Sequence, residues 1–319
     1  MKLFTPIRAE SVIAHGELRL IGQIRQWLGD ASPASPFGIG DDCAVLPPTK
    51  KLQLVTTDPV IYGQHFDDTV PPRAVGAKLL KRNLSDIASM GGKPVAAVVS
   101  LALASDTNIA WLREFYRGLA ACARRYGVKI VGGDITQGPP GFFGAFLTLH
   151  GEATGKRIVT RGGALPGDRI YVTGRLGGSL LGHHYKFTPR LTEGAWLAGR
   201  KEVCAMMDVS DGLAKDLDAL TPAGLAPALI AAAIPISAAA RKSAAQTKQS
   251  PLFHALSDGE DYELLLIVCY RADVSRLERA WKKRFPHLKL SHVGHFAKKE
   301  AMPAHAVRLV DYSGYEHLR

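Results

Sequence analysis

The alternation of strand-like and helix-like runs, separated by glycine and proline, most constrains the fold of this 319-residue chain. Val95–Leu103 and Phe142–His150 have the length and apolar composition of strands. Before them, Pro71-Pro72 opens a helical segment that Gly91-Gly92 closes, and Thr107 is a candidate N-cap of a second helix. The pattern predicts mixed α/β structure.

The rest of the chain continues this alternation, and its length suits two domains better than one core. The turn-rich passage Arg161–Asp168 is the best candidate for a boundary region, and we draw the domains at 1–154 and 155–319. Further strands are expected at Cys43–Leu46, Leu52–Thr57, Lys129–Val131, Arg169–Thr173, Ala205–Val209 and Tyr262–Cys269, and helices at Asp211–Leu220 and Arg271–Phe285.

Neither a membrane span nor a disulfide framework is expected. The uncharged run Ala219–Ala240 is interrupted by Pro222, Pro227 and Pro235, which disfavours a spanning helix. The N-terminus lacks the apolar core of a signal peptide. The four cysteines are far apart and form no CxxC pair. A cytoplasmic protein fits these features best.

The net charge of +11 makes nucleic acid a partner to consider. Lys and Arg are scattered, however, with modest clusters at Lys78–Arg82 and along Arg271–Lys299. The second cluster reads as the solvated face of a helix, and a basic surface also suits a small anionic substrate. We therefore expect no nucleic-acid partner.

Acidic residues gather beside glycines and at strand ends, although the chain has only 29 of them. One such aspartate is most simply a turn or cap residue. Six such motifs together favour a metal site, and oxygen ligands without His or Cys indicate Mg²⁺. The motifs are Gly38–Asp42, Thr56–Asp58, Asp86, Gly132–Asp134, Asp208–Asp211 and Asp258–Asp261.

Two of these motifs carry arguments of their own. Asp86 falls near the C-terminal end of its expected helix, where the macrodipole disfavours negative charge unless a cation is near. Asp208–Gly212 falls between a strand and a helix, so Ser210 or Asp211 could be an N-cap. The same geometry offers helix N–H groups to a phosphate while Asp208 and Asp211 hold its metal.

Familiar nucleotide and hydrolase motifs are absent. Gly177–Gly182 has Walker-type glycine spacing, but His183-His184 stand where Lys-Ser/Thr is required, and we interpret the segment as a loop. Gly38-Ile-Gly40 lacks the third glycine of a dinucleotide fingerprint, and no GxSxG occurs.

Read in order, the motifs resemble the thiamine-monophosphate kinase family, part of a superfamily with aminoimidazole ribonucleotide synthetase and selenophosphate synthetase. The similarity covers nearly the whole chain. Its pieces are Gly16-Glu-Leu, GIGDDCAVL, TTDPVIYGQHF, NLSDIASMGGKP, GGDITQ, TRGGALPGD, VTGRLGG, FTPR, MDVSDGL, SDGEDYELL and Gly314-Tyr315.

The resemblance implies a fold, a reaction and a set of site residues. It implies an N-terminal domain that binds ATP and Mg²⁺ and forms a dimer sheet with its twin in a homodimer, and a C-terminal α/β domain that closes over the nucleotide. The implied reaction is ATP-dependent phosphorylation of thiamine monophosphate. Implied metal ligands are Asp41, Thr56, Thr57, Asp58, Asp86, Asp134, Asp208 and Asp211. Implied ATP contacts are Tyr116, Gly133, Asp134, Arg161 and Ser210, and implied substrate contacts are His65, Glu260 and Tyr315.

The chemistry of the implied substrates agrees with this residue set. The acceptor is itself a phosphate, ionised at neutral pH, so neither a general base nor a nucleophilic residue is expected. The obstacle is bringing two polyanions together, and several Mg²⁺ ions held by carboxylates address it. We expect a direct in-line transfer without a phosphoenzyme.

Three features depart from the family pattern. Ile135 and Gln137 stand where the family usually has Thr and Arg, and Asp258 stands where a glycine is usual. The stretch between Gly182 and Thr188 is short. None of these changes removes an implied metal ligand.

Two alternatives remain open. One is a related ATP-dependent synthetase of the same superfamily, although a selenophosphate enzyme should carry a reactive cysteine, and Cys43 is more simply a small buried residue. The other is a catalytically silent sensor of nucleotide or thiamine phosphate. The intact acidic set disfavours a sensor, because a mere binder need not keep so many mutually repelling carboxylates.

Overall fold

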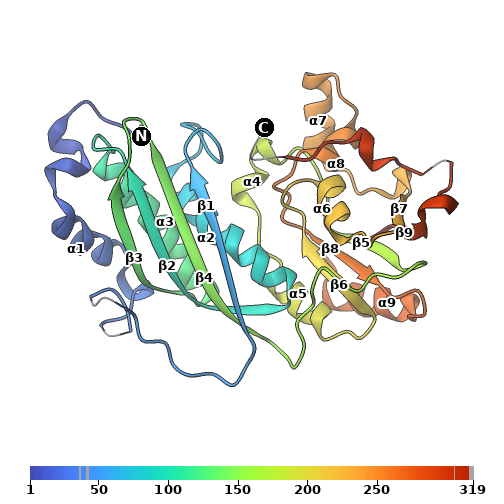
Figure 1. Cartoon of the computed structure of the whole chain (residues 1–319). Helices are drawn as coiled ribbons and strands as arrows, with labels where there is room; N and C mark the ends of the chain where they lie inside the picture. The colour runs from blue at the N-terminus through green and yellow to red at the C-terminus, as the bar shows by residue number, and fades with distance from the viewer. Residues whose placement is uncertain (36, 41–42, 305, 316–319) are drawn as a thin grey trace. The chain divides into compact units, whose positions relative to one another are not determined.

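The computed structural model describes residues 1–35, 37–40, 43–304 and 306–315. The chain divides into two compact units. The first consists of Met1–Ile87 and Lys93–Ala153, and the second of Ala88–Gly92 and Thr154–Arg319. The expectation of mixed α/β structure is confirmed, because each unit combines one sheet with helices (Figure 1).

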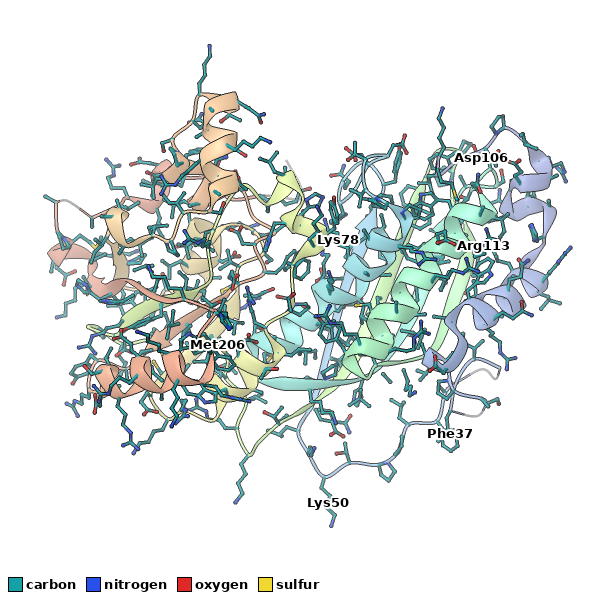
Figure 2. All side chains as sticks on the ribbon, turned by 180° about the vertical axis from the view of Figure 1, so that it is seen from behind. Phe37, Lys50, Lys78, Asp106, Arg113 and Met206 are labelled. Atoms are coloured by element: carbon teal, nitrogen blue, oxygen red, sulfur yellow. The ribbon has the colours of Figure 1, made fainter. Side chains whose placement is uncertain are left out.

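The first unit is built on a four-stranded mixed sheet of order β1-β4-β2-β3. β1 pairs antiparallel with β4, and β2 pairs parallel with β3. Helices α2 and α3 lie on one face of the sheet, as Figures 1 and 2 show from opposite sides. The elements are α1 Glu17–Leu28, β1 Gln53–Ile61, α2 Pro72–Ser89, β2 Gly92–Leu103, α3 Ile109–Tyr126, β3 Lys129–Gln137 and β4 Phe143–Ala153.

Helix α3 shows how local sequence fixes the ends of an element. Its N-cap is Asn108, whose side chain accepts hydrogen bonds from the backbone N–H groups of Ala110 (2.8 Å) and Trp111 (3.3 Å). The expected cap at Thr107 is therefore wrong by one residue, because the Thr107 hydroxyl donates to the carbonyl of Ala104 instead. Gly127 ends the helix in the left-handed conformation.

The two faces of the first sheet differ in burial. Side chains that face α2 and α3, such as Leu147 and Leu149 of β4, are fully buried. On the opposite face Val55 is 69% exposed, Phe146 40% and Val98 38%. Among the described residues of the first unit, this face therefore exposes several apolar side chains.

The second unit is built on a five-stranded antiparallel sheet of order β6-β8-β5-β9-β7. Its strands are β5 Arg169–Thr173, β6 Val203–Asp208, β7 Leu225–Leu229, β8 Leu264–Val268 and β9 Leu290–Lys298. Its helices are α4 His183–Lys186, α5 Leu191–Ala198, α6 Leu213–Leu220, α7 Ala238–Thr247, α8 Pro251–Ser257 and α9 Val274–Arg284.

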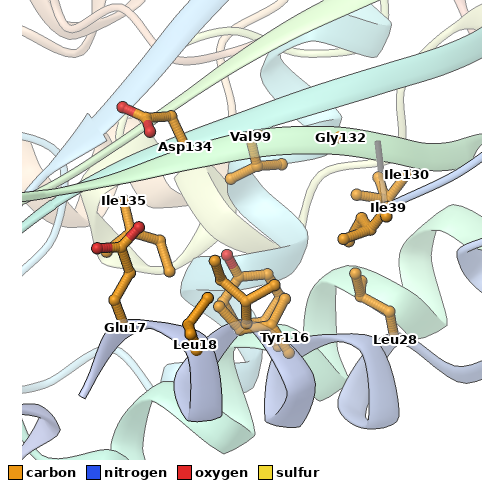
Figure 3. A pocket seen from close by; sticks show the side chains of 14 residues that line it. Glu17, Leu18, Leu28, Ile39, Val99, Tyr116, Ile130, Gly132, Asp134 and Ile135 are labelled. Atoms are coloured by element: carbon orange, nitrogen blue, oxygen red, sulfur yellow. The ribbon is translucent and has the colours of Figure 1, made fainter. Parts of the chain in front are cut away.

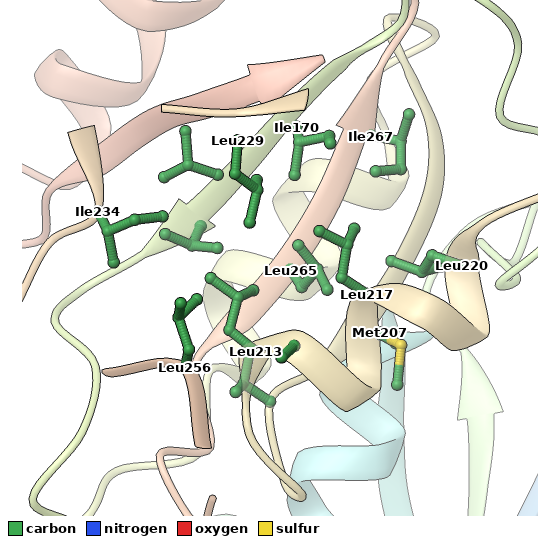
Figure 4. Packing of buried hydrophobic residues seen from close by; sticks show 14 of the residues in the cluster. Ile170, Met207, Leu213, Leu217, Leu220, Leu229, Ile234, Leu256, Leu265 and Ile267 are labelled. Atoms are coloured by element: carbon green, nitrogen blue, oxygen red, sulfur yellow. The ribbon is translucent and has the colours of Figure 1, made fainter. Parts of the chain in front are cut away.

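Both faces of this sheet are covered, which explains the apolar run of β8. Leu265 and Ile267 point into a core that α6 and α8 close (Figure 4). Leu264, Leu266 and Val268 belong to a second core, on the face covered by α5 and α9. All five residues are fully buried, so the strand has no polar alternation.

Several expected boundaries change in the structure. Cys43–Leu46 is not a strand, and β3 continues through Gly132 and Asp134 to Gln137 rather than ending in a turn. His183 and His184 begin the short helix α4 instead of lying in a loop. The elements that were not predicted are helices α1, α4, α5, α7 and α8 and strands β7 and β9. In the described part of the chain, no helix has the length and apolar character needed to cross a membrane.

Candidate functional site

Three of the expected metal ligands meet in the first unit. Thr56 and Asp58 lie two residues apart on β1, so their side chains leave the strand on the same face. The Thr56 hydroxyl donates a hydrogen bond to the Asp86 carboxylate of α2. The Asp58 carboxylate accepts from the Arg82 guanidinium at 3.2 Å. Since Arg82 and Asp86 are four residues apart, α2 presents both to β1 from one face.

Thr57 and Asp134 lie elsewhere in this unit. The Thr57 hydroxyl donates to the Leu147 carbonyl (3.1 Å) and accepts from the Thr148 hydroxyl (3.3 Å). Asp134 lies on β3, at the opposite edge of the sheet from β1. Three strand spacings, about 14 Å, separate these edges. Asp134 is therefore not part of the Thr56–Asp58–Asp86 group within one chain, and Asp41 lies outside the described residues.

A pocket of about 550 Å³ lies between α1, α3 and β3 (Figure 3). It is lined by the expected ATP contacts Tyr116, Gly133 and Asp134. Asp134 and Glu17 lie at the same end of it, and Leu28 lies toward the other, apolar end. A polar end joined to an apolar cavity suits a ligand with a flat apolar part and a charged part.

The walls of this pocket depend on specific residues. A Cβ at Gly133 would lie 2.0 Å from the Val99 carbonyl oxygen, so no larger residue fits there. Burial raises the pKa of the Tyr116 phenol, which stays neutral beside Trp27, with ring centroids 6.1 Å apart. Glu17 was missed as a site residue. Its place in the matched Gly16-Glu-Leu motif was the available signal.

The second unit gathers four expected site residues from three distant segments. Ser210 and Asp211 lie between β6 and α6. The carbonyl of Ser210 accepts from the Glu260 N–H at 2.7 Å, and that of Asp211 accepts from the Tyr315 N–H at 2.9 Å. Gly259 permits this approach, because a Cβ there would lie 2.8 Å from the Ser210 oxygen.

Asp216 organises the turn between β6 and α6. Its carboxylate accepts hydrogen bonds from the N–H groups of Ser210 and Asp211, both at 3.0 Å. Burial raises its pKa well above the ordinary value, and the nearby Asp208 and Asp211 raise it further. The Lys215 ammonium already contacts the Asp211 carboxylate at 2.7 Å, and a metal ion would further offset the repulsion among these three carboxyl groups.

The donor chemistry of both groups suits Mg²⁺, because every ligating atom is an oxygen. The side chains of these two groups do not surround a common point as the ligands of one metal ion would. Within the described ranges, no group of three or more His, Cys, Asp or Glu is arranged to hold a metal ion.

The remaining expected residues have simpler surroundings. His65 accepts from the Ile61 N–H through Nδ1 at 3.1 Å, and its carbonyl accepts from the Lys78 ammonium at 2.7 Å. It lies in the first unit, whereas Glu260 and Tyr315 lie in the second. Arg161 is exposed in the second unit.

The family departure at Asp258 has a structural explanation. Its carboxylate accepts from the Gly178 N–H at 2.7 Å and contacts His254 Nδ1 at 2.9 Å. The extra negative charge therefore has local partners. His183 and His184 form no metal pair, because their ring nitrogens contact the carbonyls of Asp261 and Ser179, each at 3.0 Å.

Asp261→Asn is expected to make stability less dependent on pH. Burial raises the pKa of Asp261 well above its ordinary value of 3.8, with Glu263 and Asp258 adding to the effect and the Gly177 N–H opposing it. Because the pKa of this carboxyl is higher in the folded protein than in the unfolded chain, its contribution to stability is complete at pH values below the pKa of the unfolded chain. The contribution is lost as the pH rises through the pKa of the folded protein. Urea unfolding between pH 5 and 8.5 should show wild-type stability falling more steeply with pH than the variant, by up to about 1.4 kcal/mol per pH unit. Equal slopes would contradict the assignment.

Comparison with known proteins gives consistent matches along the chain. Residues 40–153 match the family model for the N-terminal domain of AIR synthase related proteins. The chain is 38% identical to the thiamine-monophosphate kinase of Rhodopirellula baltica, over 74% of this chain and 77% of the relative. It is 34% identical to the thiamine-monophosphate kinase of Escherichia coli K12, over 80% and 83% respectively.

Solved structures agree with these matches. AaThiL complexed with AMPPCP and TMP superposes with a TM-score of 0.71 at 29% identity, covering 95% of this chain and 97% of that one. Escherichia coli HypE, a hydrogenase maturation protein, superposes with a TM-score of 0.73 over 90% of this chain and 95% of that one. At 17% identity, HypE shares only the fold.

Proposed function

The chain belongs to the thiamine-monophosphate kinase family, and from this premise we propose that it transfers the terminal phosphoryl group of ATP to thiamine monophosphate, forming thiamine diphosphate. The observation that carries the proposal is the similarity, over 95% of the chain, to a protein that holds AMPPCP and TMP together. The retained acidic residues favour an active enzyme over a silent sensor.

Nucleotide binding is assigned to the pocket of the first unit. Its apolar part, around Ile24, Leu28 and Ile130, offers a surface on which an adenine ring can pack. Gly133 lets β3 pack closely against the Val99 backbone of β2 at the wall of this pocket. Asp134 at the polar end would face the phosphate side. In the second unit, Ser210 and the exposed guanidinium of Arg161 are proposed to contact phosphate oxygens.

Magnesium is proposed to bind through the carboxylates, and when bound it would neutralise the phosphates of donor and acceptor. Thr56, Asp58 and Asp86 would hold it in the first unit, and Asp208 and Asp211 in the second. Asp41, Thr57 and Asp134 stay candidate ligands. The chain's own task is to present these oxygens in fixed positions, since phosphoryl transfer needs positioning and charge neutralisation more than a base.

Substrate recognition is assigned to His65, Glu260 and Tyr315. Thiamine monophosphate carries a cationic thiazolium ring, for which the Glu260 carboxylate is a suitable partner. Glu260 has a positive φ of 53°, uncommon for a residue with a side chain, and its carboxylate accepts from the Tyr262 hydroxyl at 3.2 Å. The turn therefore holds the Glu260 carboxylate in one position, and its backbone is strained there.

The test is conversion of thiamine monophosphate with ATP and MgCl₂, followed by chromatography of the thiamine phosphates. A panel with free thiamine and aminoimidazole precursors separates the kinase from related synthetases. Thiamine diphosphate should form from the monophosphate only, and γ-labelled ATP alone should leave no label on the protein. Tight binding of both substrates without product would instead establish a sensor.

We also propose that the protein is a homodimer whose subunits pair through the exposed face of the first sheet. This face exposes Val55, Val98 and Phe146, an apolar set that a second copy would cover. Phe146→Glu is expected to turn the dimer into a monomer in analytical ultracentrifugation. Val310→Glu, at an equally apolar but 83% exposed position of the second unit, is the matched control and should stay dimeric. A monomeric wild type would exclude the pairing.

A cytoplasmic location and the absence of membrane or nucleic-acid partners stay predictions. All four cysteines are free thiols, and Cys43 is exposed, so the expectation of a buried residue at this position is wrong.

A further inference from the structure

Arg82 stands out among the cations of the first unit because it is buried beside the proposed metal ligands. The residue is only 8% exposed. One guanidinium nitrogen, Nη2, donates to Asp58 Oδ1 at 3.2 Å, and the other, Nη1, donates to the Pro59 carbonyl at 2.7 Å. Two acceptors on adjacent residues of β1 thus fix the plane of the guanidinium.

Helix α2 carries this charge as part of a continuous row. Lys78, Arg82 and Asp86 recur every four residues and so share one helix face (Figure 2 labels Lys78). Lys78 is fully buried and donates to the His65 carbonyl at 2.7 Å. Within this row, Arg82 places buried positive charge against the strand that carries Thr56 and Asp58, and Lys78 holds the segment that follows the strand.

We propose that Arg82 is a fixed counter-ion of the Thr56–Asp58–Asp86 group, which holds the group together before a divalent cation binds and limits its affinity for that cation. The proposal rests on the magnesium assignment made above. Asp86 accepts a hydrogen bond from Thr56, which lies two residues from Asp58 on β1, so two carboxylates of like charge belong to one face of the strand. The guanidinium offsets their repulsion at every physiological pH, because arginine does not lose its proton.

The sign of the effect on metal binding follows from Coulomb's law. A positive charge that already contacts Asp58 competes with an incoming Mg²⁺ for the carboxylate and repels it. Removing that charge should tighten Mg²⁺ binding by about tenfold, the size expected for a single and a double charge about 6 Å apart in a water-like dielectric. The metal-free protein should lose stability at the same time, because the Arg82 charge no longer offsets the repulsion between Asp58 and Asp86.

The test uses the full chain without nucleotide and titrates MgCl₂ alone at constant ionic strength. Isothermal calorimetry gives the dissociation constant, and thermal unfolding gives the melting temperature with and without the metal. Arg82→Met removes the charge, and Arg82→Lys keeps it. Arg73→Met is the matched control, because Arg73 lies on the same helix, is 64% exposed and pairs with Glu114. Asp58→Asn identifies the part of the signal that belongs to this group.

The expected result for Arg82→Met is a lower melting temperature without metal, an Mg²⁺ dissociation constant about tenfold lower, and a larger rise of the melting temperature on adding Mg²⁺. Arg82→Lys should bind Mg²⁺ within about threefold of the wild type, and Arg73→Met should match it. An Arg82→Met protein that binds Mg²⁺ no more tightly than the wild type would overturn the inference. If Arg82→Met does not fold without metal, Arg82→Gln is measured instead, with the same expected shift.

The inference and the proposed function can fail separately. Metal binding is measured without thiamine monophosphate, so an inactive wild type whose Arg82→Met variant binds Mg²⁺ more tightly would refute only the kinase assignment. If the wild type is active but Arg82→Met binds Mg²⁺ with the same dissociation constant, only the counter-ion role is refuted.

Discussion

Asp58→Asn is expected to reduce turnover of thiamine monophosphate by about 10²–10³-fold, the usual size of losing one electrostatic contact to a transferring group. The amide keeps the size of the side chain and can still accept from Arg82, but it lacks the charge that draws a divalent cation. Because the Asp58 side chain is 26% exposed and Arg82 keeps its hydrogen bond to the Pro59 carbonyl, the variant should remain folded. Turnover at saturating ATP and MgCl₂, with circular dichroism of both proteins, is the measurement.

The matched control for this prediction is Asp30→Asn. Asp30 also pairs with an arginine, at 3.0 Å from Arg124, but its side chain is 78% exposed on the surface. It should keep wild-type turnover, because surface ion pairs contribute little. An Asp58→Asn enzyme with more than a tenth of wild-type activity would remove Asp58 from the proposed ligands.

The sequence predicted those parts of the fold that local patterns determine. The helix from Pro72 to Ser89 follows from its apolar stripe and flanking prolines and glycines, and Arg169–Thr173 is a strand with the bounds expected. Strand β8 was recognisable because a run of five apolar residues needs cover on both faces. Helix α1 escaped notice because no expected strand or cap marked its ends.

The arrangement of the site depended on pairings that no local pattern contains. Thr56 and Asp86 come from separate motifs and meet only because β1 packs against α2. Asp134, which shares the same acidic signature, lies at the far sheet edge because the strand order is β1-β4-β2-β3. In the sequence Arg82 is one residue of a modest basic cluster. Its contact with Asp58 depends on tertiary packing and could not be predicted from the local sequence.

The chemical character of the site was predictable for a different reason. Crowded carboxylates repel one another and so cost free energy. Their repeated placement beside glycine turns therefore predicts a bound cation even before any contact is known. Asp216 shows the limit of that argument. It reads as an ordinary helix residue, yet its carboxylate holds the N–H groups of Ser210 and Asp211.

The second large effect is expected from Arg190→Met, which should destabilise the second unit by about 3–5 kcal/mol, because it leaves a buried carboxylate without its ion partner. Arg190 donates to Glu263 through Nε at 2.8 Å and Nη2 at 2.5 Å, and the Thr173 hydroxyl donates to the same carboxylate at 2.6 Å. The Glu263 side chain is 3% exposed, so water cannot replace the guanidinium. Urea unfolding of the variant and the wild type measures the loss.

The control for this prediction is Arg175→Met, an exposed arginine just after β5, which should change stability by less than about 0.5 kcal/mol. The double variant Arg190→Met/Glu263→Gln should recover part of the loss, because no uncompensated charge remains. An Arg190→Met protein as stable as the wild type would show that the Glu263 charge is compensated by other groups.

The same variant connects stability to substrate binding. Glu263 follows Glu260 and Tyr262 on the chain, and both of these hold positive φ angles, of 53° and 51°, that the surrounding structure must enforce. The Arg190–Glu263 pair fixes the end of this strained segment, whereas the pocket proposed for the adenine ring of ATP is lined by residues of the first unit. Arg190→Met should therefore raise the KM for thiamine monophosphate by about tenfold or more and the KM for ATP by clearly less, since only the proposed phosphate contact Ser210 adjoins this segment. Equal increases in both constants would mean that the pair supports the fold in general and not the substrate turn.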